Sequence, residues 1–344
     1  MQKENIKNLS LKELQEIVSS WEEKLFHARQ VFRWIYKKGI EDFALMSDLP
    51  PGLRKKLAER FIINSLQLSK AAQSSDGTEK FLFESSDHNF IEAVSIPAKG
   101  RVTGCISTQA GCKFGCAFCA SGKLGFRRNL TTAEVLDEVL YLKNKSSVKK
   151  LTHIVFMGTG EPLDNYAEVL KAIRMINSPD GLNIGARRIT ISTAGLIPGM
   201  EKLSKEGLQI ELSVSLHAAD NKTRDLIMPI NKIYPLDNLI SACRAYFKKT
   251  NRQVTFEYIL IKGLNSDLQS AQKLGRMLTG MDCKVNLIPA NPITEQQVFP
   301  PESKDIALFK NALLKTGINV TLRKPRGKDI EAACGQLRLK YEKR

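Results

Sequence analysis

Short apolar runs alternate with amphipathic stretches along most of the chain after residue 100, and this alternation restricts the fold more than any other feature. The apolar runs predict buried strands, and the stretches between them repeat apolar residues at helical spacing. Strands that alternate with helices form a parallel sheet with right-handed crossovers. The sequence therefore predicts an α/β fold, a full or partial βα barrel. The candidate strands are residues 152–157, 188–192, 210–216, 254–261, 284–288 and 319–322, and the clearest helices are residues 133–143, 167–176 and 268–278.

The first 100 residues follow a different pattern. Apolar residues repeat at helical spacing after Ser10, a candidate N-cap, and again over residues 28–38 and 53–61. Short β-like runs at residues 80–84 and 90–96 follow, separated by turn-forming residues. We therefore expect three parts, which are a helical accessory domain (residues 1–65), a β-rich connector (66–100) and a core barrel (101–340).

Polar or glycine-rich motifs follow nearly every candidate strand of the barrel. Functional groups of βα barrels gather at the carboxyl ends of the strands, although Gly, Pro, Ser and Asn also dominate ordinary turns. Ser192, Ser215 and Asn291 could hydrogen-bond ribose hydroxyls or a carboxylate, and a glycine-rich backbone could hold an ammonium group. Four such motifs in succession favour a shared site, and they are Gly158-Thr-Gly-Glu-Pro162, Ser192-Thr-Ala-Gly195, Ser215-Leu-His217 and Pro289-Ala-Asn-Pro292.

Three cysteines, Cys112, Cys116 and Cys119, lie on a glycine-rich loop early in the barrel region. Three thiolates at this spacing can ligate three corners of a [4Fe-4S] cluster and leave the fourth iron open to a small molecule. The alternatives are a zinc site and a disulfide. Structural zinc usually takes four ligands in two separated pairs, and no fourth Cys or His lies nearby at a suitable spacing. The pattern therefore favours an iron–sulfur cluster.

The positive charge is concentrated in two segments. The net charge is +16, and residues 101–150 hold nine Lys or Arg against three Asp or Glu, while residues 321–344 hold eight against three. A polyanion would be attracted to these segments, and the basic strings at residues 126–129 and 323–328 fit phosphate contacts. A basic solubilising surface is the alternative explanation.

The compartment follows from cysteine usage and hydropathy. The chain has seven cysteines, an odd number, and its N-terminus does not resemble a signal peptide. Its longest apolar runs are far shorter than the roughly 20 residues that cross a bilayer. We therefore expect a cytoplasmic protein that is not inserted in a membrane.

Taken together, the motifs closely resemble those of the radical S-adenosylmethionine (SAM) RNA adenine methyltransferases of the RlmN/Cfr type. The resemblance runs from about residue 29 to residue 337, in order and at comparable spacing. Besides the cysteine triad and the motifs at 192–195 and 215–217, it rests on Cys105-Ile-Ser-Thr-Gln-Ala-Gly-Cys112, Met157-Gly-Thr-Gly-Glu-Pro-Leu163, Met228-Pro-Ile-Asn231, Val285-Asn-Leu-Ile-Pro-Ala-Asn-Pro292 and Ala332-Ala-Cys-Gly-Gln-Leu337.

The resemblance implies a partial (β/α)6-type radical SAM barrel with the helical accessory domain in contact with RNA. It implies a [4Fe-4S] cluster on Cys112, Cys116 and Cys119, two molecules of SAM, 23S rRNA and tRNA as substrates, and a flavodoxin-type electron donor. We also expect a monomer. The residues that the resemblance assigns to SAM binding are Gly160, Glu161, Ser192, Ser215, Leu216, His217 and Asn291.

The resemblance further implies a two-cysteine mechanism. One SAM methylates the Cys334 thiolate, and a radical from a second SAM activates that methyl group for addition to the adenine ring. Cys105 then attacks the sulfur of Cys334, which releases the RNA and leaves a disulfide. Glu92 is the implied proton acceptor, with Cys105 as the other candidate. The two cysteines should therefore lie within disulfide distance.

Two branches of this family differ in the carbon that they methylate. Gly160-Glu161-Pro162 and the segment from Arg326 to Cys334 resemble the C2 branch, so we predict C2 methylation of adenine in 23S rRNA and beside the tRNA anticodon. The alternatives are a C8 methyltransferase, a non-catalytic iron–sulfur protein that binds RNA or senses redox state, and a radical activase. Cys243 and Cys283 have no companion motif, so we expect them to be buried structural residues.

Overall fold

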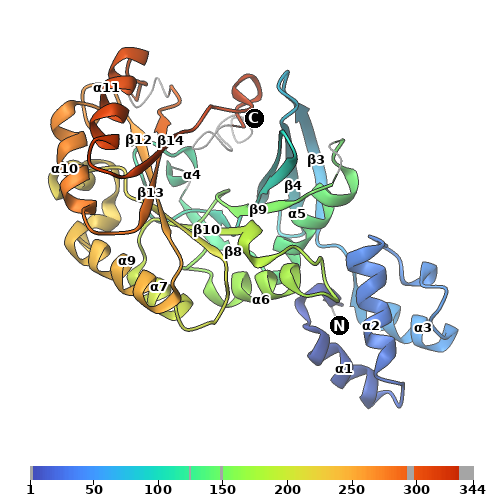
Figure 1. Ribbon diagram of the computed structural model, residues 1–344. Coiled ribbons are helices and arrows are strands. Elements are labelled where there is room, and N and C mark those ends of the chain that lie inside the picture. The colour runs from blue at the N-terminus through green and yellow to red at the C-terminus, as the bar shows by residue number, and fades with distance from the viewer. Residues whose placement is uncertain (1–2, 124, 148–149, 293–297, 333–344) are drawn as a thin grey trace.

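One mixed sheet forms the centre of the molecule. The computed structural model describes residues 3–123, 125–147, 150–292 and 298–332 (Figure 1). The sheet has ten strands in the order β14-β13-β12-β11-β10-β9-β6-β5-β4-β3. They are β3 (Leu66–Gln73), β4 (Glu79–Ser85), β5 (Phe90–Ala98), β6 (Arg101–Cys105), β9 (His153–Phe156), β10 (Ile189–Thr193), β11 (Glu211–Ser215), β12 (Val254–Leu260), β13 (Cys283–Pro289) and β14 (Asn319–Leu322).

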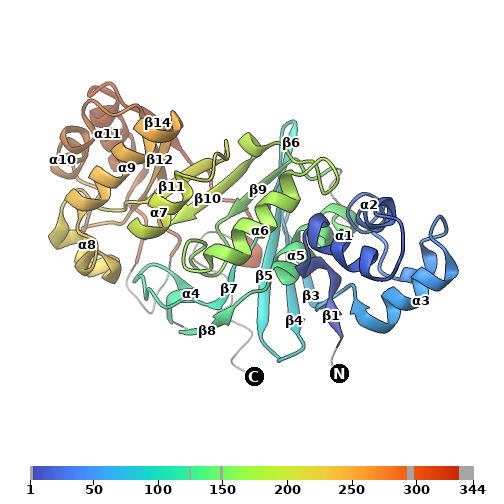
Figure 2. The same ribbon diagram turned by 90° about the horizontal axis from the view of Figure 1, so that it is seen from below.

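Strands β6 and β9 to β14 are all parallel, and helices cover their outer face (Figures 1 and 2). Along β9, Ile154 and Phe156 are fully buried, whereas His153 and Val155 face the barrel interior. This confirms the predicted partial (β/α)6-type barrel. The helices are α5 (Thr132–Lys145), α6 (Tyr166–Asn177), α7 (Ile197–Leu203), α8 (Asn221–Ile227), α9 (Leu236–Thr250), α10 (Leu268–Leu278) and α11 (Ser303–Leu314).

The β-rich segment at residues 66–100 continues the barrel sheet. Strands β3, β4 and β5 form an antiparallel meander, and β5 pairs antiparallel with β6 so that Val94 lies opposite Cys105. Gly100, with φ of +74°, allows the tight turn between β5 and β6. The sheet is therefore continuous across residue 100.

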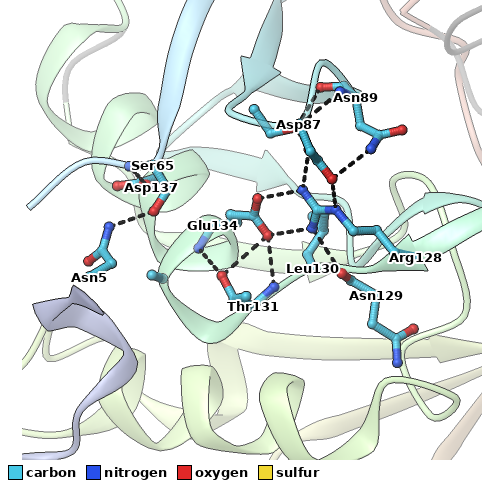
Figure 3. A network of polar contacts seen from close by, with 12 residues as sticks. Asn5, Ser65, Asp87, Asn89, Arg128, Asn129, Leu130, Thr131, Glu134 and Asp137 are labelled. Atoms are coloured by element: carbon cyan, nitrogen blue, oxygen red, sulfur yellow. Dashed lines mark hydrogen bonds and ion pairs between the residues drawn. The ribbon is translucent and has the colours of Figure 1, made fainter. Parts of the chain in front are cut away.

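The N-terminal residues form a small helical unit against α5. Ser10 and Glu13 form a capping box at the start of the first helix, which confirms the predicted N-cap. Asp137 of α5 accepts a hydrogen bond from the Ser65 amide at 2.8 Å (Figure 3). It also pairs with the buried ammonium of Lys7. The elements of this unit are β1 (Glu4–Asn5), α1 (Leu11–Ser20), α2 (Phe26–Phe32), a π-helical turn (Arg33–Lys37), α3 (Pro51–Arg60) and β2 (Phe61–Ile62).

None of the helices in the described ranges is long and apolar enough to cross a bilayer.

Candidate active site

The motifs predicted at the strand ends meet around one cavity of about 160 Å³, here called the cysteine cavity. It lies at the carboxyl ends of the parallel strands, as the alternation of strands and helices predicts. Aromatic and apolar side chains form much of its wall, including those of Phe114, Phe118 and Met157. The predicted residues that line it are Cys112, Cys116, Cys119, Gly160, Glu161, Ser192, Ser215, His217 and Asn291.

The cysteine loop is fixed by backbone contacts. It follows β7 (Gln109–Gly111), which pairs with β8 (Phe126–Asn129), and ends at the short helix α4 (Ala120–Lys123). The Cys112 amide donates to the Gly125 carbonyl at 3.0 Å, and the Ala117 amide donates to the Ile227 carbonyl at 2.9 Å. Gly111 has φ of +81°, and a Cβ there would lie 1.9 Å from the Gly125 oxygen. Only glycine fits at this position.

The donor set of the loop fits an iron–sulfur cluster better than a single metal ion. Within the described residues, no three Cys, His, Asp or Glu side chains are grouped closely enough to hold one ion. A single zinc ion requires all its ligands within about 2.3 Å, whereas a four-iron cluster takes each thiolate on a different iron. The three thiols line one cavity and influence one another electrostatically.

Burial keeps the thiols of Cys112 and Cys116 protonated when no metal is bound. It raises the pKa of Cys112 to about 11 and that of Cys116 further, so that metal binding would displace protons. The six cysteines within the described residues are not joined to one another by disulfides.

The glycine-rich turn after β9 packs directly against Gln109, the first residue of β7. A Cβ on Gly160, whose φ is +105°, would lie 2.6 Å from the Gln109 Cβ. The buried Glu161 carboxylate accepts hydrogen bonds from the amides of Leu163 at 3.0 Å and Ala194 at 2.7 Å. Burial raises the pKa of Glu161 to about 7. Glu161 thus ties the turn after β9 to the turn after β10.

Arg224 of α8 holds the ends of β10 and β11 in place. Its buried guanidinium donates to the carbonyls of Ala194 at 2.8 Å, Ser215 at 3.0 Å and Leu216 at 3.0 Å. The Leu216 amide donates to the Glu257 carbonyl, so both backbone groups of Leu216 are used within the fold. The Leu216 side chain is buried and does not line the cysteine cavity.

His217 contributes an uncharged ring to the cavity wall. Its Nδ1 accepts a hydrogen bond from the Ile259 amide at 3.0 Å, which leaves the proton on Nε2. The ring meets Phe118 edge to face, with centroids 4.6 Å apart. Burial, followed by the charge of Arg224, lowers the pKa of His217 to about 3.

Cys105 lies beside the C-terminal segment rather than at the cavity wall. It ends β6 and belongs to a packed cluster with Val94 and Ala332, and Met157 of the cysteine cavity packs against this cluster. Cys334 lies outside the described residues. The described chain therefore reaches the neighbourhood of Cys105 two residues before Cys334.

The segment before Ala332 is anchored on the turn between β3 and β4. Asp329 accepts hydrogen bonds from the Ser74 hydroxyl at 2.5 Å and the Ser75 amide at 3.0 Å. The Gly327 amide donates to Asp76 at 3.1 Å. The C-terminal segment therefore crosses from β14 to the opposite edge of the sheet (Figure 1).

Glu92 of β5 is buried beside Lys80 and does not line the cysteine cavity. The Lys80 ammonium lies 3.4 Å from the Glu92 carboxylate and donates to the Glu331 carbonyl at 3.2 Å. Lys80 therefore links Glu92 to the C-terminal segment.

Arg128, one of the arginines expected to contact phosphate, is part of the internal structure. Its guanidinium forms two hydrogen bonds of 2.8 Å with Glu134 and also pairs with Asp87 (Figure 3). The Arg128 guanidinium lowers the pKa of Asp87 far below its usual range. This arginine joins β8, α5 and the turn after β4, so two carboxylates of the fold already offset its charge, and the phosphate contact at Arg128 stays a prediction.

Sequence analysis missed Arg224, Lys80 and Glu257, which hold the site together. Glu257 accepts hydrogen bonds from Ser213 and Asn286, each at 2.8 Å, and lines the cysteine cavity. The one signal available for Glu257 was a charged residue within an otherwise apolar predicted strand. Arg224 and Lys80 belong to no motif.

Comparisons with known proteins agree with this site. A family profile described as the Radical SAM superfamily matches residues 106–273, and one described as the ribosomal RNA large subunit methyltransferase N-terminal domain matches residues 4–63. A crystal structure of a radical SAM methyltransferase from Sphaerobacter thermophilus superposes with a TM-score of 0.94 at 41% identity, covering 97% of this chain and 99% of that one.

Two curated relatives carry the name probable dual-specificity RNA methyltransferase RlmN. The protein of Clostridium novyi is 45% identical, with 98% of each chain covered. The protein of Caldanaerobacter subterraneus is also 45% identical, with 98% of this chain and 99% of the relative covered. The chain therefore belongs to the RlmN family of radical SAM methyltransferases.

Proposed function

We propose that the protein methylates C2 of adenine in 23S rRNA and in tRNA beside the anticodon. The observation that carries the proposal is the meeting of the three cysteines with the strand-end motifs around one cavity, next to Cys105 and the anchored C-terminal segment. The relatives are named dual-specificity RNA methyltransferases, which supports two kinds of RNA as substrates.

In this proposal Cys112, Cys116 and Cys119 hold a [4Fe-4S] cluster. Gly160, Ser192, Ser215, His217 and Asn291, which share the cavity with them, bind SAM. When bound, these groups supply the one-electron cleavage of SAM to a 5′-deoxyadenosyl radical. Glu161 and Leu216 act through the backbone that they fix, because their hydrogen bonds position the strand ends.

Cys334 is proposed to carry the methyl group, and Cys105 to resolve the adduct with RNA. The packing of Cys105 against Ala332 supports this pairing, because Ala332 precedes Cys334 by two residues. A thiolate at Cys105 would attack the Cys334 sulfur and form an S–S bond, while the bond between that sulfur and the carbon on adenine breaks. That carbon keeps the electron pair and takes up a proton, which gives the methylated base. Cys105 or Glu92 would take the C2 proton, and the contact of Lys80 with both Glu92 and Glu331 supports a role for Glu92.

The proposal also includes a flavodoxin-type electron donor and action as a cytoplasmic monomer. One electron is required for each cleavage of SAM, and the chain offers no further cysteine triad that could supply it.

Anaerobic reconstitution with iron, sulfide and reductant tests the proposed function. Supplied with methyl-labelled SAM and unmodified RNA, the protein should form 5′-deoxyadenosine, methylate Cys334 and produce 2-methyladenosine in RNA, each identified by mass spectrometry. Formation of 8-methyladenosine would overturn the choice of C2. Absence of both 5′-deoxyadenosine and the methyl group on Cys334 would instead indicate a non-catalytic iron–sulfur protein.

The two-cysteine scheme has its own test. Cys105→Ala should leave Cys334 methylation intact and trap RNA covalently on Cys334, because no thiol remains to resolve the adduct. Cys243→Ala is the matched control, since Cys243 is buried in α9, and it should turn over without trapping RNA. A Cys105→Ala protein that keeps its cluster but forms no RNA conjugate would refute the scheme.

A further inference from the structure

A second chamber lies along the barrel interior beside the cysteine cavity. It has a volume of about 480 Å³, against about 160 Å³ for the cysteine cavity. Arg101 and His153 begin β6 and β9, whereas Arg323 and Lys324 follow the end of β14, so this chamber extends from the amino ends of some strands to the segment after β14. It is here called the basic chamber.

The wall of the basic chamber is polar and positively charged. Barrel interiors of this class are normally filled by bulky aliphatic side chains, whereas β6, β10 and β12 place Thr103, Thr190 and Thr255 here. Glu257 is the one carboxylate among the described residues that line it, and its oxygens accept from Ser213 and Asn286. The basic residues that line it are Arg101, Lys284, Arg323, Lys324 and Arg326.

Three of these cations have no anionic partner in the described ranges. Arg101, Lys284 and Lys324 form no ion pair there, while Arg326 lies 3.8 Å from Asp76. Burial and the neighbouring charges of Arg101 and Arg188 lower the pKa of His153, which leaves a neutral ring among them. The chamber therefore concentrates positive charge at Arg101, Lys284 and Lys324.

The basic chamber adjoins the cysteine cavity near Cys105 and the C-terminal segment. Met157, Glu257 and Arg323 line both spaces. Met157 also packs against the cluster that contains Cys105 and Ala332. A group that enters through the basic chamber would therefore reach Met157, beside the cluster that contains Cys105, without passing the cysteine loop.

We propose that the RNA strand enters through the basic chamber, with its phosphates against Arg101, Lys284 and Lys324, and that the target adenine reaches Cys105 at the junction of the two spaces. This inference rests on the proposed function and assigns its RNA contacts. SAM and RNA then approach the C-terminal segment through two different spaces, the cysteine cavity and the basic chamber. The extruded nucleotide fits a polar chamber with cations at its wall, because phosphate contacts provide most of the affinity of RNA-binding surfaces.

Single replacements of the three cations test this route. Arg101→Gln, Lys284→Gln and Lys324→Gln each remove one charge, and Lys249→Gln is the matched control on exposed outer helix α9. The probe is an RNA stem–loop with an unmodified adenine beside the anticodon. Each chamber variant should raise KM for this RNA severalfold, with kcat nearly unchanged. The slope of log Kd against log salt should also fall by about 0.7 to 0.9 per lost contact. The control should alter neither quantity.

Methylation of Cys334 in the absence of RNA provides the second readout. It should be unaffected by the three replacements, because the route concerns RNA alone. Loss of this methylation would mean that the chamber serves the chain's own C-terminal segment, and the route would be overturned. An unchanged KM and salt slope in all three variants would also overturn it, while the proposed function would stand on RNA methylation by the unaltered protein. If that protein binds RNA with the expected salt slopes but never methylates it, the route holds and the proposed function fails.

Discussion

At the scale of single residues, several side chains serve the site through the charge state that burial imposes on them. His217 remains neutral because its ring is buried, accepts from the Ile259 amide and lies near the Arg224 guanidinium. Its φ of +59° is a left-handed conformation, which an asparagine also adopts readily. The ring can therefore be replaced without straining the backbone.

The neutral ring makes stability depend on pH in a defined direction. The pKa of His217 is about 3 in the fold and about 6.5 in an unfolded chain, so its stabilisation is complete above pH 6.5 and is lost as the pH falls toward 3. We compare the unaltered protein with the His217→Asn variant, both without a cluster. When the pH falls from 7 to 5, the free energy of unfolding of the unaltered protein should decrease by about 2 kcal/mol more than that of the variant. Urea denaturation at the two pH values measures the difference.

The control for this prediction is His88→Asn. His88 has the same φ of +59° but is 86% exposed at its side chain. It should keep the pH dependence of the unaltered protein. Equal slopes for the His217→Asn variant and the unaltered protein would show that burial does not hold the ring neutral.

At the scale of elements, the C-terminal segment depends on one glycine. Gly327 has φ of +60°, and a Cβ there would lie 2.8 Å from the Ala332 Cβ and 3.0 Å from Thr78. Gly327→Ala should therefore displace the segment that leads to Cys334, at a backbone cost of about 1–2 kcal/mol plus the clash. The rate of Cys334 methylation should fall about tenfold or more, which corresponds to about 1.4 kcal/mol, and mass spectrometry of the Cys334 peptide measures it.

Gly317→Ala is the control that distinguishes the effect of backbone strain from the effect of displacing the C-terminal segment. Gly317 also has a positive φ, of +82°, but a Cβ there would meet nothing within 4 Å. It should cost similar stability and leave Cys334 methylation nearly unchanged. Equal loss in both variants would mean that general destabilisation, rather than the position of the segment, limits methylation.

Helices and strands could be predicted from the sequence where the local apolar repeat matches the face that the element buries in the fold. The predicted helix at 268–278 and strand at 319–322 coincide with α10 and β14, because each carries a regular apolar repeat. Strand β6 was missed, since it begins at Arg101 and contains Gly104, and its place is set by pairing with β5 and β9. The cysteine cavity was predictable because parallel strands bring their carboxyl ends together.

The supporting contacts of the site were not predictable in the same way. Arg224 and Lys80 act on carbonyls and carboxylates that lie on other elements, and no local spacing encodes such partners. Arg128 belongs to a basic string, and its pairing with Glu134 and Asp87 appears only when β8, α5 and the turn after β4 come together. Basic strings therefore overestimate the positive charge that is available to RNA.

At the scale of the whole molecule, the N-terminal unit is locked onto the barrel by a buried charge pair. Lys7 and Asp137 are both buried, and the Asn8 side chain accepts from the Ala133 amide at the start of α5 at 2.9 Å. The unit lies beside α5, on the outside of the barrel and away from α8 to α11 (Figures 1 and 2). Its orientation relative to the barrel is therefore fixed before any RNA binds.

Breaking this pair should loosen the N-terminal unit without disturbing the cysteine cavity. Lys7→Met leaves the Asp137 carboxylate buried and uncompensated, so stability should fall by about 3–5 kcal/mol. The double variant Lys7→Met/Asp137→Leu removes both charges and should recover most of that loss. Urea denaturation measures stability, while Cys334 methylation and RNA methylation are followed separately. If the unit positions RNA, Lys7→Met should reduce RNA methylation and spare Cys334 methylation, and equal loss of both activities would show that the pair supports the barrel itself.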